Sequence, residues 1–186
     1  MGKIVNPLPV KLIIGLITKD LFYFEIIKKK LFRKYGPMDF ISPVLDFNLT
    51  DYYKKEMGSQ LKRQFLSFKK LIPPQNLAGI KHFTNGLEKK HNDIQSNRTI
   101  NIDPGYITLS KLILATTKNF AHRIYIKDGI FEEITLYFKN GTFTYGKWTY
   151  PDYASASHIA VFNEIRKQYY KQIAGRYGIS ELYRCV

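Results

Sequence analysis

The residues of this chain that could carry chemistry gather between Arg98 and Tyr153. His122 and Glu133 could serve together as a general base or hold a divalent ion, because an imidazole oriented by a carboxylate accepts a proton or a metal. Asp103 supplies a second carboxylate in the same stretch. We therefore predict a polar site with His122, Glu133 and Asp103 as its candidate catalytic residues. The alternative is a structural histidine that only satisfies its hydrogen bonds.

Cations in the same stretch suit an anionic ligand. Arginine offers a planar fork of donors to a phosphate and lysine a point charge. The candidate cations are Arg98, Lys111, Lys118 and Arg123. Hydroxyl donors, aromatic rings that could stack a base and one carboxylate complete the predicted ligand-binding set: Thr117, Thr135, Trp148, Tyr150 and Asp152. The alternative is that the Arg and Lys side chains simply alternate out of a sheet into water.

No known nucleotide, dinucleotide, zinc-protease or serine-hydrolase motif is present, since the patterns G-x-x-x-x-G-K-[ST], G-x-G-x-x-G, H-E-x-x-H and G-x-S-x-G are missing. The sequence therefore assigns no cofactor. Cys185 is the single cysteine, which excludes a disulfide within the chain and a cysteine-based metal site. We expect a reducing, cytoplasmic location on this ground.

Two turn signals position the polar residues. Asp128-Gly129 and Asn140-Gly141 each favour a type I′ turn and predict antiparallel strands at 121–126, 130–138 and 142–149. Two-residue loops would pair Ile124 with Glu133, His122 with Thr135, and Leu136 with Tyr145. One face would then form the core, with Ile134, Leu136, Phe138, Phe143 and Tyr145. The other face would carry His122, Glu133, Thr135, Tyr137, Thr144 and Trp148, or would simply be solvated.

The flanks of this meander predict further elements. Asp103-Pro104-Gly105-Tyr106 fits a type II turn, with Pro and Gly at the central positions. A short helix is expected at 109–116, carrying Lys111, and the last helix at 157–174.

The N-terminal half alternates helical and strand-like patterns. We predict a strand at 10–17, a helix at 20–35, an edge strand at 39–48, a strand at 63–71, a helix at 75–91 and a strand at 98–103. This is the ferredoxin-like βαββαβ order. The expected fold is therefore α+β, with a ferredoxin-like half, a three-stranded meander and a C-terminal helix. We expect one continuous domain over 1–186, which could be subdivided into 1–103 and 104–186.

The composition indicates a basic protein with a sizeable core. Hydrophobic residues make up 45% of the 186, and the net charge is +14. Residues 1–100 hold 18 Lys and Arg against 8 Asp and Glu. The excess favours an anionic small molecule or nucleotide as the partner. A non-enzymatic RNA-binding module using the basic N-terminal half is the alternative, and an interaction protein without a pocket is a third. The apolar run at 12–17 is too short to cross a membrane.

Six short motifs carry a family resemblance: YYKKEMG at 52–58, NIDPGY at 101–106, LATTK at 114–118, HRIY at 122–125, EITL at 133–136 and WTYPDY at 148–153. Together they resemble the bacterial domain-of-unknown-function family 4416, over residues 11–166. The resemblance implies no activity, because that family is uncharacterised. Some members carry a GTP-binding label, which no motif of this chain supports. The leading hypothesis is a protein that binds a phosphate-bearing small molecule or nucleotide, with hydrolase or transferase chemistry left open.

Overall fold

The central strand of the protein is β1 (Lys11–Thr18), in which all eight residues are buried. The computed structural model describes residues 2–50, 52–94 and 97–178. β1 pairs with β4 (Lys62–Phe68) on one side and with β5 (Ile100–Ile107) on the other, both antiparallel. A strand buried on both faces reads as a nearly continuous apolar run, which is the pattern of KLIIGLIT between its first and last residues.

The sheet continues beyond these three strands on both sides. β2 (Met38–Ile41) and the two-residue β3 (Leu45–Asp46) both pair with β4, so Pro43 splits the single edge strand expected at 39–48. On the other side, β6 (Lys111–Thr116) pairs with β5 and with β8 (Ile130–Lys139). β7 (Ile124–Lys127) and β9 (Thr142–Tyr145) pair with β8. The strand order is β2-β4-β1-β5-β6-β8-β7.

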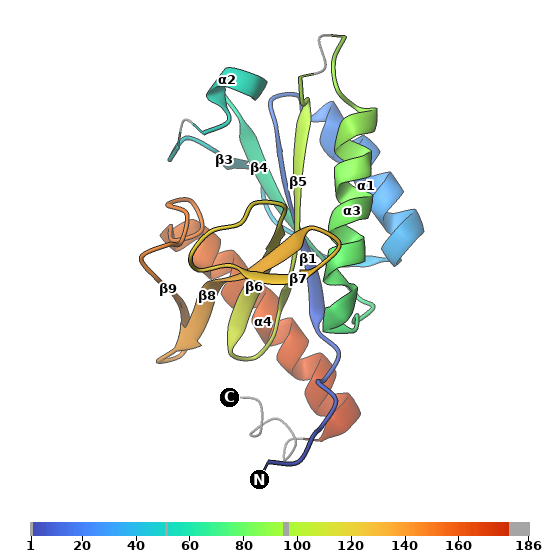
Figure 1. Ribbon diagram of the computed structural model, residues 1–186, viewed down its shortest axis with the longest axis vertical. Coiled ribbons are helices and arrows are strands. Elements are labelled where there is room, and N and C mark those ends of the chain that lie inside the picture. Colours follow the sequence, from blue (N-terminus) through green and yellow to red (C-terminus); the bar gives the residue numbers. More distant parts are fainter. Residues whose placement is uncertain (1, 51, 95–96, 179–186) are drawn as a thin grey trace.

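Helices cover both faces of the sheet (Figure 1). The buried residues of α1 (Phe22–Tyr35) and α3 (Leu77–Lys90) pack on the face that carries Leu12, Ile14 and Leu16. The opposite face carries Ile13 and packs against α4 (Ala156–Tyr177), which begins after the capping residue Ser155. The four-residue α2 (Lys54–Met57) precedes β4, and a 3-10 turn (Pro74–Asn76) precedes α3. The expected α+β class is confirmed.

Both predicted hairpin turns are confirmed, and one of the two predicted registers is not. Asp128, Gly129, Asn140 and Gly141 all have positive φ, as type I′ turns require. Leu136 pairs with Tyr145 as expected. The pairing of Ile124 with Glu133 is wrong, because an irregularity between Tyr125 and Lys127 shifts the partner to Glu132. His122 lies before β7 and does not pair with Thr135.

The predicted faces of β8 are also partly wrong. β8 has one extra residue opposite β6, since Leu112 pairs with Leu136 while Ile113 pairs with Ile134. This bulge breaks the strict alternation of side chains, so Thr135 and Leu136 are both buried. Ile134 is consequently 41% exposed, and Tyr145 at the end of β9 is 54% exposed.

Two predictions for 103–116 are wrong. The residues expected to form a type II turn lie inside β5, where Pro104 pairs with Ile14 and Gly105 with Ile13. The residues expected to form a helix at 109–116 are mostly strand β6. An apolar run this short suits either element by its pattern, and pairing with β5 and β8 decides for the strand.

Among the described residues, none of the helices has the length and apolar character needed to cross a bilayer.

Candidate functional site

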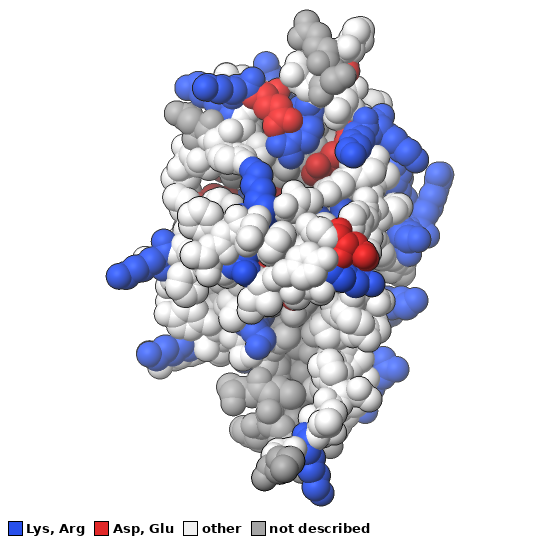
Figure 2. Space-filling model, in the orientation of Figure 1, with Lys and Arg blue, Asp and Glu red and all other residues white. Residues whose placement is uncertain are grey.

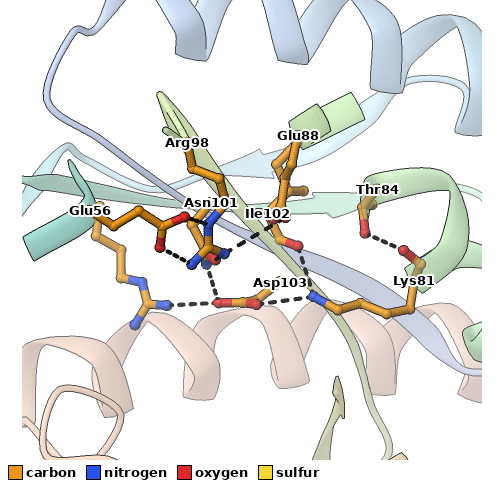
Figure 3. Close-up of polar contacts among 9 residues, drawn as sticks. Glu56, Lys81, Thr84, Glu88, Arg98, Asn101, Ile102 and Asp103 are labelled. Carbon is orange, nitrogen blue, oxygen red and sulfur yellow. Dashed lines mark hydrogen bonds and ion pairs between the residues drawn. The ribbon is translucent and has the colours of Figure 1, made fainter. Parts of the chain in front are cut away.

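The sheet forks between β5 and β6. The two strands pair only where residues 105–107 meet residues 112–114, although both continue beyond that ladder. On the open side of β5, the N–H of Ile102 donates to Glu88 Oε1 at 2.5 Å, and the Ile102 carbonyl accepts from Lys81 Nζ at 3.3 Å (Figure 3). Two side chains of α3 therefore take the place of a neighbouring strand. Backbone N–H groups two residues apart on a strand point to the same side, so residue 104 would present its N–H where Ile102 does, toward α3. Proline has no N–H, so Pro104 leaves no unpaired donor there.

A cleft with a cavity of about 410 Å³ occupies the fork. It is lined by residues of β4, β5, β6, β8, α2 and α3 and of the segments that follow β3, α3, β6 and β9. Its cations are Arg63, Lys81, Lys89, Arg98, Lys118 and Arg123. Its carboxylates are Glu56, Glu88, Asp103, Glu133 and Asp152. Aromatic rings, among them Tyr52, Tyr53 and Tyr150, complete the wall.

Arg63 forms the floor of the cleft and is only 2% exposed. Its Nη1 contacts the buried carboxylate of Asp152, and its Nη2 lies 3.6 Å from Asp103 Oδ2. The guanidinium also lies over the rings of Phe47 and Tyr153, with its Cζ 5.2 and 4.7 Å from their centroids. A buried charge needs such a close counter-charge, because desolvation costs several kcal/mol per ion.

Two further guanidinium groups are held at the wall by carboxylates. Arg98 donates to both oxygens of Glu56, at 2.7 and 2.6 Å, and to Asn101 Oδ1 at 2.8 Å (Figure 3). Arg123 donates to Glu133 Oε2 at 2.7 Å, to the Tyr150 hydroxyl and to a backbone carbonyl. Each arginine has five N–H donors, and three of them are used in each case. Both groups therefore keep donors for a ligand while their orientation is fixed.

Lys89 and Lys118 differ from the other cations of the cleft. Within the part of the chain that the structure describes, no carboxylate lies in ion-pair range of either one. Lys118 Nζ instead lies 4.5 Å from the centroid of the ring of Tyr52, which also lines the cleft. These two ammonium groups have their charge available for an anion.

Glu88 is a carboxyl of the cleft whose pKa lies well above its ordinary value. Burial raises its pKa to about 7, and the nearby Asp103 adds to the rise. Lys81, the N–H of Ile102 and Arg98 oppose it. A carboxyl that titrates near neutral pH inside a cleft is typical of functional sites.

The predicted pair of His122 and Glu133 is close in space, but only Glu133 lines the cavity. His122 Nε2 lies 3.1 Å from Glu133 Oε2, and its ring stacks on Trp148. Glu133 is buried and also accepts from Arg123 and from the Thr135 hydroxyl. With three donors on one carboxylate, Glu133 is occupied in orienting Arg123. His122 supports that arrangement from behind.

The structure brings eight of the twelve predicted site residues to the cleft wall: Arg98, Asp103, Thr117, Lys118, Arg123, Glu133, Tyr150 and Asp152. Thr135 and His122 contact Glu133, Trp148 stacks on His122, and none of these three residues lines the cavity. Lys111 lies at the far end of β6, opposite Tyr137, and is not part of the site. Among residues 2–50, 52–94 and 97–178, no group of three or more His, Cys, Asp or Glu could hold a metal ion.

Sequence reasoning missed the contribution of β4 and α3 to the cleft. Lys81, Asn85, Glu88 and Asn92 all line it. Their spacing of four, three and four residues is that of one helix face beside the apolar stripe, although α3 ends at Lys90, before Asn92. That polar stripe was a readable signal. No sequence signal pointed to Arg63, since a single arginine in an apolar strand does not indicate which residues surround it.

Comparison with known proteins yields one match. The family model described as Domain of unknown function (DUF4416) matches residues 8–169. No curated protein and no solved structure matches the chain.

Proposed function

Since the chain belongs to the DUF4416 family, a domain of unknown function, we propose from the cleft alone that it binds a phosphate-bearing small molecule, with a nucleotide as the best fit. The observation that carries this proposal is the pair of ammonium groups, Lys89 and Lys118, that have no carboxylate partner among the described residues and line a cleft of about 410 Å³. Clefts of this size accommodate molecules as large as a mononucleotide.

The rest of the wall suits the same ligand. Arg98 and Arg123 are pre-oriented by Glu56 and Glu133 and keep N–H donors for phosphate oxygens. The Tyr52 and Tyr53 rings, with centroids 4.9 Å apart, offer apolar surface on which a base could stack. The cleft wall carries six cations against five carboxylates, so its formal charge is positive, and neither Lys89 nor Lys118 has an ion-pair partner among the described residues.

A thermal-shift series with AMP, GMP and inorganic pyrophosphate tests the proposal. A ligand at about 100 times its Kd should raise the Tm by about 5–10 °C, whereas adenosine, which lacks the phosphate, should not. The variant Lys89→Met/Lys118→Met should bind at least about tenfold more weakly, because it removes two charge-assisted contacts.

The matched control is Lys139→Met, which removes an exposed lysine from the end of β8. It should bind like the wild type. Absence of any saturable shift, or unchanged affinity in the double lysine variant, would reject a phosphate site in this cleft.

A second candidate function is binding of single-stranded RNA, which one surface feature favours. Lys and Arg side chains line the edge of the molecule where α1 and α3 lie (Figure 2). α1 carries the exposed Lys29 and Arg33, and α3 ends with the exposed Lys90. RNA binding of this kind should weaken steeply as the salt concentration rises. The variant Lys29→Gln/Arg33→Gln should lower the slope of log Kd against log salt by about 1.4, since two phosphate contacts are lost.

Fluorescence anisotropy with a labelled oligonucleotide measures Kd at each salt concentration, and salt-independent binding would exclude the RNA-binding function.

We also infer a ferredoxin-like unit and a single domain. The order β2-β4-β1-β5, with every neighbouring pair antiparallel and the two helices α1 and α3 on one face, supports the first inference. The second is supported by the continuation of the same sheet through β6, β8 and β7.

A further inference from the structure

Glu88 is the carboxyl of the cleft that the protein leaves least engaged. Glu56 binds Arg98 through both oxygens, Glu133 accepts from three donors, and Asp152 contacts Arg63. Asp103 accepts from Asn101 at 2.6 Å and from Lys81 at 3.3 Å. In the described part of the chain, Glu88 has one close hydrogen bond, from the N–H of Ile102 to Oε1.

The second oxygen of Glu88 accepts no hydrogen bond from the described residues. The bond from Ile102 fixes the carboxyl group, and Oε2 lies 3.8 Å from Arg98 Nη1, which is too far for a hydrogen bond (Figure 3). Arg98 is already committed to Glu56 and Asn101. Because Glu88 is 7% exposed and lines the cleft, Oε2 is placed to meet a ligand atom.

The surroundings of Glu88 stabilise both of its protonation states. Burial and Asp103 on β5 favour the neutral acid. Lys81 on α3, the Ile102 N–H and Arg98 favour the anion, and Glu56 on α2 offsets Arg98. The resulting pKa of about 7 means that neither form dominates near neutral pH.

We propose that Glu88 takes up a proton when a phosphate-bearing ligand enters the cleft, and that the Oε2–H so formed donates a hydrogen bond to a phosphate oxygen. The inference rests on the proposed function. A carboxylate would repel the phosphate, whereas a carboxylic acid is a strong donor to it. The proton comes from solvent, one O–H bond forms on Glu88, and no bond of the ligand breaks.

The sign of the pH dependence follows directly. Below pH 7 Glu88 is already protonated and binding needs no further proton. Above pH 7 each bound ligand should draw up to about one proton from the buffer, and affinity should fall about tenfold per pH unit.

Isothermal titration with AMP near pH 8, in two buffers of different ionisation enthalpy, counts the protons taken up. Wild-type protein should take up about one proton more per AMP than Glu88→Gln, which keeps an acceptor for Ile102 and a donor for the ligand but cannot titrate. The proton bound by the AMP phosphate itself is common to both proteins and cancels in the difference. Glu164→Gln, at an exposed site on α4, should behave like the wild type.

The outcomes separate this inference from the proposed function. Equal proton uptake by wild type and Glu88→Gln would overturn the inference while binding itself stands. Failure of AMP to bind the wild type would reject the proposed function. A measurement without ligand tests Glu88 in either case. Carbon-13 NMR of glutamate-labelled protein follows the titration of each carboxyl, and the Glu88 signal is the one lost in Glu88→Gln. The Glu88 carboxyl should titrate with a midpoint near pH 7. A midpoint near the ordinary value of about 4.3 would overturn the inference.

Discussion

The Gly105→Ala variant is expected to lose about 3 kcal/mol of unfolding free energy, and its Tm should fall by about 6–12 °C. A Cβ at this position would lie 2.2 Å from the carbonyl oxygen of Ile113 and 2.7 Å from the Leu114 side chain. Backbone cannot yield as a flexible side chain can, so β6 would have to move away. The three-residue ladder that joins β5 to β6 would weaken, and it is the only ladder between these two strands in the described chain. Chemical denaturation followed by circular dichroism measures the loss.

Gly79→Ala provides the matched control, because a Cβ at this position on the exposed side of α3 would meet nothing within 4 Å. Alanine is the better helix former, so this variant should gain up to about 1 kcal/mol. If Gly105→Ala were as stable as the wild type, the close approach of β6 to β5 would not exist, and the forked sheet would be incorrect.

The same glycine explains why part of the fold could not be predicted from the sequence. Asp-Pro-Gly is a strong turn signal because Pro sets φ and Gly tolerates positive φ. Here Gly105 has no positive φ, and its lack of a side chain serves close strand packing instead. The Asp-Gly and Asn-Gly signals succeeded because both turns do use positive φ. Local patterns therefore predict local geometry well and fail where a distant strand dictates the residue.

The residues of the cleft were also predictable where they lie close together in sequence, and not where distant strands bring them together. Arg98, Asp103, Arg123 and Glu133 were identified by their types within one stretch, and all four line the cleft. Glu88 was missed because its role depends on β5 and β6 separating, which the predicted turn and helix in that region concealed. Once the fork is known, a carboxyl and an ammonium group on α3 are required to satisfy the open edge of β5.

Arg63→Met is expected to cost about 3–5 kcal/mol of unfolding free energy, because it leaves the buried Asp152 without its counter-charge. Asp103 would lose a second cation at 3.6 Å, while keeping Lys81 and Asn101. The methionine side chain fills most of the volume between Phe47 and Tyr153, so the loss should come mainly from the uncompensated carboxylate. Equilibrium unfolding in urea, monitored by tryptophan fluorescence from Trp148, gives the free energy.

Lys62→Met, one residue earlier on the same strand, separates this effect from general loss of charge. Lys62 pairs with Asp46 at 2.5 Å, but the Lys62 and Asp46 side chains are 39% and 68% exposed, so its removal should cost less than about 1 kcal/mol. The double variant Arg63→Met/Asp152→Asn should recover part of the stability lost in Arg63→Met, because the amide is neutral. If Arg63→Met were as mild as Lys62→Met, Asp152 would be hydrated rather than sealed beneath the cleft. If the double variant showed no recovery, packing of the guanidinium against the aromatic rings, and not its charge, would hold the floor of the cleft together.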